Sequence, residues 1–142
     1  MSFSIDGKTV IVTGAANGIG AALARHFAEN GANVMCADID EKALKKDLGE
    51  SADDSNVRYF AGDLREKLTL ANLLSATVDA FDRVDVLVNA SRQMATTDPL
   101  DMDDETVEKL LQQNLMTSLR LSQMVAKRMI KQDEEQDHEF AG

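Results

Sequence analysis

Cysteine, proline and aromatic residues are scarce in this chain of 142 residues, which has one cysteine, one proline and no tryptophan. A single cysteine excludes an internal disulfide, and Cys36 lies in an apolar run where a buried, unreactive thiol is expected. No apolar run reaches the length of a membrane span, and the first residues do not resemble a signal peptide. These absences predict a soluble protein of a reducing compartment, the cytoplasm, with no membrane partner.

Basic residues are also few: 15 Lys and Arg stand against 25 Asp and Glu, giving a formal net charge of −10. The basic residues are scattered, whereas nucleic acid requires clustered positive charge, so nucleic acid is not expected as a partner. His26 and His138 lie far apart and away from any cysteine or spaced carboxylate pair. No metal site is therefore predicted.

The chain does contain a regular alternation of strand-like and helix-like patterns. The strand-like runs are continuously apolar, as is typical of parallel strands covered on both faces, and they span Thr9–Thr13, Asn33–Asp38, Val57–Ala61 and Val84–Asn89. Helices are predicted over Gly18–Asn30, from about Asp40, over Arg65–Phe81 and over Asp103–Lys131. Such repeated units predict an α/β fold, a doubly wound parallel sheet of Rossmann type with strand order 3-2-1-4.

The predicted domain covers residues 1–131, and residues 132–142 are predicted to form an acidic loop or tail. Five of the nine residues from Lys131 to Glu139 are Asp or Glu, and such a run is usually solvated. The long helix before it is expected to bury one face, on which Asn114 falls. The other residues of that face are Val107, Leu110, Leu111, Ser118, Leu121, Ser122, Val125 and Met129.

A glycine-rich turn, Thr13–Gly20, connects the first predicted strand to the first predicted helix. A buried strand, a glycine turn and a helix N-terminus in this order form a phosphate-binding site, because the helix dipole and free N–H groups favour an anion. Gly14 suits the tight turn, Gly18 the approach to a pyrophosphate and Gly20 the packing of helix on strand. Because Ala21 follows Gly20 where a P-loop requires lysine, the turn favours a dinucleotide.

The first helix is expected to pack through Ile19, Ala22, Leu23 and Phe27, which share one face.

Asp38 ends the second predicted strand, 18 residues after Gly20. At that position an acidic side chain can accept hydrogen bonds from the adenosine ribose hydroxyls. The alternative is a turn or capping aspartate, a role that Asp40 already suits. A carboxylate here favours NAD over NADP, since it would repel a 2′-phosphate. Asn17 and Ile39 stand where Arg or Lys would indicate NADP.

The motif Thr-Gly-x-x-x-Gly-Ile-Gly at Thr13–Gly20 resembles the cofactor loop of the short-chain dehydrogenase/reductase family, and matching motifs continue to about Lys131. The resemblance implies that Asp63 and Leu64 lie beside the adenine, and that Asn89, Ala90 and Ser91 lie against the cofactor. It implies that Asn114 belongs to the catalytic tetrad and holds a water in a proton relay. Taken alone, each residue is also explained by turn chemistry or by a structural amide.

Two departures from the family pattern are visible. Ser91 replaces the glycine of Asn-Ala-Gly, and the family's serine and Tyr-x-x-x-Lys motif are absent before Gly142. Tyr59 has Asp63, not lysine, four residues later, and is expected to be a packing residue. The fourth strand would also be an unusually apolar sheet edge. The chain is therefore predicted to be the cofactor-binding part of a longer protein, inactive alone, whose remainder follows in the polypeptide or is a separate chain.

The resemblance implies an NAD-dependent oxidoreductase that transfers a hydride between the nicotinamide and an alcohol or carbonyl substrate. It also implies a homo-oligomer, a dimer or tetramer, formed through the long helix. The alternative is a catalytically inactive module that binds NAD(H) or docks a partner. Cofactor binding without turnover would favour this alternative.

Overall fold

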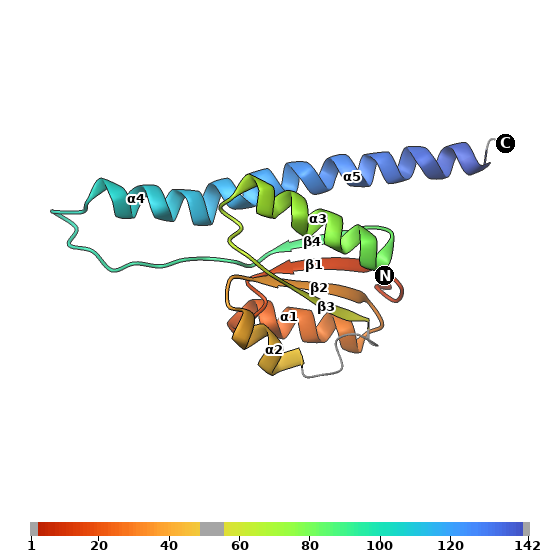
Figure 1. Ribbon diagram of the computed structural model, residues 1–142, viewed down its shortest axis with the longest axis horizontal. Coiled ribbons are helices and arrows are strands. Elements are labelled where there is room, and N and C mark those ends of the chain that lie inside the picture. Colours follow the sequence, from red (N-terminus) through yellow and green to blue (C-terminus); the bar gives the residue numbers. More distant parts are fainter. Residues whose placement is uncertain (1–2, 49–55, 141–142) are drawn as a thin grey trace.

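The computed structural model describes residues 3–48 and 56–140, which form one parallel sheet flanked by helices (Figure 1). The sheet has the order β3-β2-β1-β4. Its strands are β1 (Thr9–Thr13), β2 (Asn33–Asp38), β3 (Val57–Ala61) and β4 (Val86–Asn89). The doubly wound fold and the strand order predicted from the sequence are confirmed, as are the bounds of the first three strands.

The strands are in parallel register, with Val10 of β1 opposite Val34 of β2 and Val86 of β4. β4 begins two residues later than predicted. Asp85 explains this difference, because its N–H donates to the Thr9 carbonyl (2.9 Å) while its carboxylate accepts the Thr9 N–H (2.9 Å). Because the carboxylate, not a backbone carbonyl, accepts the Thr9 N–H, Asp85 is only half paired as a strand residue and the regular ladder begins at Val86.

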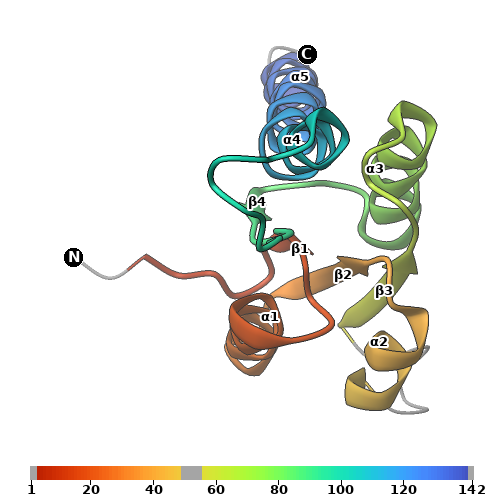
Figure 2. The same ribbon diagram turned by 90° about the vertical axis from the view of Figure 1, so that its left-hand side faces the viewer.

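Helices cover both faces of the sheet, as Figure 2 shows end-on. α1 (Gly18–Glu29) and α2 (Glu41–Leu48) lie on one face, and α3 (Lys67–Phe81) and α5 (Thr117–Phe140) on the other. Alternate residues of β1 serve the two faces, since Val10 and Val12 pack in the core under α1 while Ile11 packs in the core under α3 and α5. This alternation is the consequence of side chains pointing to opposite faces along a strand.

The long helix predicted over Asp103–Lys131 is interrupted. α4 (Asp104–Leu111) leads into a π-helical turn, η2 (Gln112–Met116), before α5 begins. A π turn inserts an extra residue into the helix and so changes which residues on either side of it share a face. The buried residues of α5 are Thr117, Leu121 and Val125, so the predicted burial of Leu121 and Val125 is confirmed, whereas Ser118 is only half-buried.

The predictions that Leu111, Asn114 and Ser122 lie on the buried face were therefore wrong, because all three are exposed.

α5 also runs further than predicted, through the acidic run to Phe140, so the prediction of a loop or tail there is corrected for the described residues. The amide of Gln132 anchors this extension, since it donates to the Val84 carbonyl and accepts the Val84 N–H, both at 2.9 Å. Lys131 and Glu135 add an i,i+4 ion pair at 3.8 Å. These contacts offset the repulsion between the acidic side chains and the negative end of the helix dipole.

The lone cysteine is buried as expected: Cys36 of β2 is 1% exposed, and burial raises the pKa of its thiol to about 12. Tyr59, on the neighbouring strand, packs against the core under α1, which agrees with its predicted packing role. Within the described ranges, no helix is both long and apolar enough to cross a membrane.

The surface beside β4 is apolar and open. β4 pairs with β1, and its residues Val86–Val88 are half-buried. Leu111, Leu115 and Leu119 form an exposed apolar row along the helical segment that follows. The oligomer through this helix stays a prediction.

Candidate functional site

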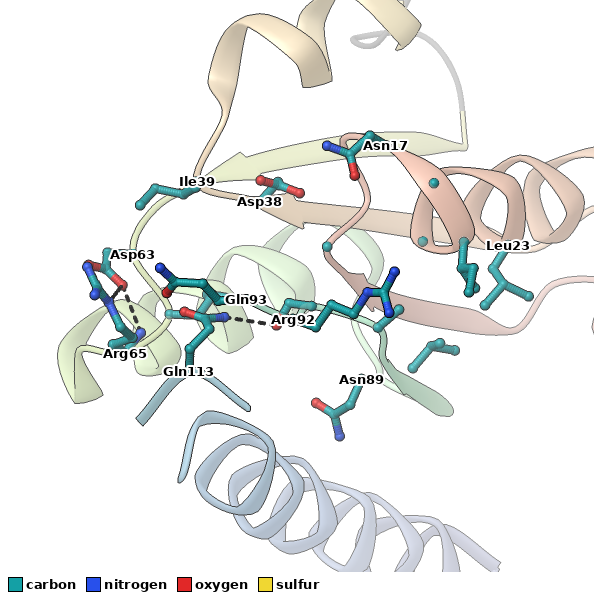
Figure 3. A pocket seen from close by; sticks show the side chains of 18 of the residues that line it. Asn17, Leu23, Asp38, Ile39, Asp63, Arg65, Asn89, Arg92, Gln93 and Gln113 are labelled. Carbon is teal, nitrogen blue, oxygen red and sulfur yellow. Dashed lines mark hydrogen bonds and ion pairs between the residues drawn. The ribbon is translucent and has the colours of Figure 1, made fainter. Parts of the chain in front are cut away.

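A pocket of about 730 Å³ opens at the carboxyl ends of the strands (Figure 3). This edge is where open α/β sheets bind their ligands, because the strand order reverses there between β1 and β4. Every residue predicted to bind the cofactor lines this pocket, and they come from four separate loops: Gly14, Asn17, Gly18, Ile19, Gly20, Asp38, Ile39, Asp63, Leu64, Asn89, Ala90 and Ser91. The structure thus brings together residues that are far apart in sequence, while their binding role stays a prediction.

The glycine turn requires glycine for two different reasons. Gly14 has φ +66°, and a Cβ there would lie 2.7 Å from the Cα of Ser91. A Cβ on Gly20 would overlap the carbonyl oxygen of Gly14. Both glycines therefore allow backbone segments to pack against each other, the role the sequence assigned to Gly20.

Gly18 differs, because a Cβ there would meet no atom within 4 Å although its φ is +55°. The space in front of it belongs to the pocket. Asn17 is the extended N-cap residue of α1, and its side chain makes no capping hydrogen bond. The first N–H groups of α1 are thus left for a ligand, and the helix dipole favours an anion there.

The helix packs on the sheet through Gly20 and Ala24, not through the face predicted around Ile19. Ile19 is 69% exposed and lines the pocket, and Ala22 is exposed as well. The close contact of Gly20 with Gly14 explains the correction, because it brings this side of the helix against β1 and turns Ile19 to the rim. Phe27 does pack against the core, as predicted.

Asp38 connects the glycine turn to the end of β2. Its Oδ2 accepts the N–H of Ala16 at 3.1 Å, and its Oδ1 accepts the N–H of Asp40 at 3.0 Å. A carboxylate has about four acceptor positions, so two remain for a ligand. The capping role falls to Asp40, as the sequence suggested, since its Oδ1 accepts the N–H of Ala43 at 3.0 Å.

Asp63, after β3, is held by a neighbour that the sequence did not single out. The guanidinium of Arg65 contacts both carboxylate oxygens, at 2.6 Å for the shortest bond, and the Arg65 N–H donates to Oδ1 at 3.0 Å. The side-chain hydrogen bond from Arg65 holds the pKa of the Asp63 carboxyl below its usual value. The acceptor positions of Asp63 are largely used by this pair, and its predicted role beside the adenine stays a prediction.

Thr13 fastens the end of β4 to the glycine turn. Its hydroxyl oxygen accepts the N–H groups of Ala90 and Ser91, each at 3.2 Å. Asn89 donates from its side-chain amide to the hydroxyl of Ser122 at 3.0 Å. The serine that replaces the family's glycine also finds a partner, since the Ser91 hydroxyl accepts a bond from Gln113 at 3.3 Å.

Asn114 is exposed and does not line the pocket itself, but it holds a residue that does. Its amide donates to the carbonyl of Gln93 at 2.8 Å and accepts the N–H of Gln93 at 2.7 Å. Gln93 lines the pocket. The hydrogen-bonded partners expected for Asn114 are therefore present, whereas its burial was wrongly predicted and its catalytic role stays a prediction.

Sequence reasoning missed several residues of the pocket wall: Leu23, Gly62, Arg65, Val88, Arg92, Gln93 and Gln113. Gly62 and Val88 adjoin predicted residues and could have been found by extending each motif by one position. Arg92 and Gln93 directly follow Ser91, so the same extension would have reached them. Gln113 directly precedes the predicted residue Asn114, so a one-position extension of that motif would have reached it as well.

The residues present fit a dinucleotide. The space in front of Gly18 offers room for a ligand. The uncapped first turn of α1 offers N–H donors, and the carboxylate of Asp38 offers unused acceptor positions. A diphosphate needs the first two features, and a ribose diol needs the third. Among the described residues, no three His, Cys, Asp or Glu side chains gather as metal ligands would.

Known proteins are similar to this chain in sequence and in fold. A family model described as short chain dehydrogenase matches residues 8–136. The D-threitol dehydrogenase of Mycolicibacterium smegmatis is 34% identical over 134 residues, which cover 91% of this chain and 50% of that protein. The NAD-dependent glycerol dehydrogenase of Listeria innocua is 30% identical over 128 residues, covering 90% of this chain and 50% of that protein.

A solved structure matches this chain over a similar share of its length. A crystal structure of a short chain dehydrogenase from Mycobacterium smegmatis matches with a TM-score of 0.81 and 30% identity, covering 88% of this chain and 52% of the other. The chain thus spans about half the length of the curated relatives it matches.

Proposed function

The chain belongs to the short chain dehydrogenase family, and from this premise we propose that it is the NAD(H)-binding part of an oxidoreductase acting on an alcohol or carbonyl compound. The observation that carries the proposal is the position of Asp38. Its carboxylate is bonded to the backbone of the glycine turn at Ala16 and lines the same pocket as Gly18. A ribose acceptor and a diphosphate cradle are therefore joined in one rigid unit.

The charge of Asp38 favours NAD over NADP. A 2′-phosphate on the adenosine ribose would meet this carboxylate, and like charges a few ångströms apart repel by about 1 kcal/mol in water and several times more in a pocket. Ile39, the next residue, offers no positive charge to offset that repulsion. The related glycerol dehydrogenase of Listeria innocua is NAD-dependent, which agrees with this assignment.

In this proposal the residues of the chain bind and orient the cofactor. Gly18 and the first turn of α1 receive the diphosphate, Asp38 the adenosine ribose, and Asn89 to Ser91 flank the nicotinamide side. A nicotinamide cofactor supplies a hydride donor or acceptor when bound. The family's serine, tyrosine and lysine would come from a segment beyond the printed sequence, for which the relatives' greater length leaves room.

The proposal is tested by titrating the protein with NADH and with NADPH and following ligand fluorescence. We expect NADH to bind more tightly. Asp38→Asn keeps the shape of the side chain and removes its charge, so it should reduce the preference for NADH about tenfold or more. Asp40→Asn is the matched control, because Asp40 caps α2 and does not line the pocket.

Failure of the unmodified protein to bind NADH, or an Asp38→Asn preference equal to that of the unmodified protein, would contradict the proposal. Turnover with a panel of alcohols then separates an enzyme from the alternative, a module that binds NAD(H) without catalysis. The exposed row Leu111, Leu115 and Leu119 and the open edge of β4 are the observations that favour a docking module.

A further inference from the structure

Two arginines, Arg65 and Arg92, line the pocket, and they differ in how they are held. Arg65 forms an ion pair with Asp63 at 2.6 Å, so its charge is locally balanced. For Arg92 no carboxylate lies within ion-pair distance in the part of the chain that the structure describes. In a protein of net charge −10, this pocket therefore contains a guanidinium without a balancing carboxylate.

The backbone on either side of Arg92 is fixed. Ser91 is bound through its N–H to Thr13 and through its hydroxyl to Gln113. Gln93 is bound through both its N–H and its carbonyl to Asn114. Because both neighbours are anchored, the position from which the Arg92 side chain leaves the backbone is determined, which reduces the entropy lost on binding a ligand.

The anchored segment lies against the glycine turn. The Cα of Ser91 is 2.7 Å from the position that a Cβ on Gly14 would occupy. Figure 3 shows the Arg92 side chain extending from this segment toward the side of the pocket where Leu23 of α1 lies, and well apart from Asp38. The guanidinium thus lies on the α1 side of the pocket, the side on which the diphosphate is expected, and away from the ribose acceptor.

We propose that Arg92 is a cofactor-binding residue that contacts the diphosphate from the wall opposite the first turn of α1. The inference rests on the proposed function, because it assumes that the pocket takes a dinucleotide. A guanidinium can donate two parallel hydrogen bonds to phosphate oxygens, which a backbone N–H cannot. The glycine turn supplies partial charges and Arg92 supplies a full one, so together they enclose the anion.

The test compares three variants by NADH and ADP titration at low and at high salt. Arg92→Gln should weaken both ligands about fivefold at low salt, because a partly exposed charge-assisted contact is lost. High salt should shrink this difference, since it screens exposed charges. Arg92→Lys should recover most of the loss. Arg65→Gln changes the pocket charge by the same amount and should have a smaller effect, which separates direct contact from the general field.

Several outcomes would overturn the inference. Arg92→Gln could bind NADH as tightly as the unmodified protein, or it could lose no more affinity than Arg65→Gln does. A loss confined to NADH and not seen with ADP would place Arg92 beside the nicotinamide instead. If the unmodified protein binds neither ligand, the proposed function itself fails, and that result is visible before any variant is measured.

Discussion

Asp85 at the amino edge of the sheet and Asp38 at its carboxyl edge differ in how many of their carboxylate acceptor positions are used within the protein. At the amino edge, Asp85 accepts the N–H of Thr9 at 2.9 Å and pairs with Arg83 at 2.6 Å. At the carboxyl edge, Asp38 accepts the N–H groups of Ala16 at 3.1 Å and of Asp40 at 3.0 Å and lines a pocket of about 730 Å³. The carboxylate before β4 is therefore fully bonded within the protein, whereas the carboxylate at the end of β2 keeps acceptor positions for a ligand.

Further contacts extend this difference. At the amino edge, the Gln132 side chain of α5 hydrogen-bonds to both the N–H and the carbonyl of Val84, just before β4. At the carboxyl edge, the first turn of α1 has no side-chain cap. Polar groups satisfied within the protein contribute to stability, whereas groups left for a ligand contribute to binding. Substitutions at the amino edge should therefore act mainly on stability, whereas the loss of groups left for a ligand at the carboxyl edge should act mainly on binding.

The largest effect should come from Gly20→Ala at the carboxyl edge, where one substitution should affect stability and binding together. The new Cβ would overlap the Gly14 carbonyl, and neither backbone segment can move without shifting the turn. We expect a loss of about 3 kcal/mol in the free energy of unfolding, measured by urea denaturation, together with loss of NADH binding. Gly18→Ala is the control, since it meets no atom and should cost about 1 kcal/mol through its positive φ alone. Equal stability of the two variants would contradict the packing role of Gly20.

Asp85→Ala should produce the next largest effect, at the amino edge. It removes the acceptor of the Thr9 N–H and the partner of Arg83, and should lower the free energy of unfolding by about 2 kcal/mol. NADH affinity should stay unchanged, because Asp85 lies at the end of the sheet away from the pocket. A parallel loss of affinity would show that the two edges are coupled.

The Asp85 contribution should also depend on pH. Burial raises the pKa of this carboxyl, but the bonds from Arg83 and the Thr9 N–H outweigh burial and leave the pKa below its usual value. A lowered pKa in the folded state means that the stabilisation is present above the ordinary carboxyl pKa and is lost as the pH falls through the folded value. The stability difference between Asp85→Ala and the unmodified protein should therefore disappear in acid.

The smallest effect, and one of opposite sign, is expected for Thr9→Val. The Thr9 hydroxyl is buried and has no hydrogen-bond partner among the described residues. Valine has nearly the same shape and no polar atom to desolvate, so the free energy of unfolding should rise by about 1 kcal/mol. Thr77→Val is the matched control, because the Thr77 hydroxyl donates to the Leu73 carbonyl at 2.8 Å. That control should lose stability, and a gain in both variants would contradict the argument.

Much of the sheet could be predicted from the sequence because its signals are local. β1 and β2 have apolar interiors between polar end residues, β3 is mostly apolar and followed by Gly62, and the bounds of all three matched the prediction. The loops at their carboxyl ends follow from the strand order, which explains why the predicted cofactor residues converge on one pocket. Asp38 was predicted from its spacing to the glycine turn and its place at the end of a strand, and it does line this pocket.

The wall of the pocket opposite the glycine turn could not be predicted in the same way. The π turn over Gln112–Met116 contains no glycine or proline to mark it, and the predicted face residues Leu111 and Asn114, before and within it, are exposed. The anchoring of Gln93 by Asn114 depends on that turn and on a contact across 21 residues. Such long-range side-chain bonds leave no periodic trace in the sequence.

Cys36 gives the fold a built-in chemical reporter. It is the only thiol in the chain, it lies at 1% exposure in β2, between β1 and β3, and its pKa of about 12 leaves almost no thiolate at neutral pH. A thiol reagent can therefore react only when the sheet opens. The rate of labelling would measure that opening directly, without any introduced probe, and a bound ligand that stabilises the folded state should slow the labelling in proportion.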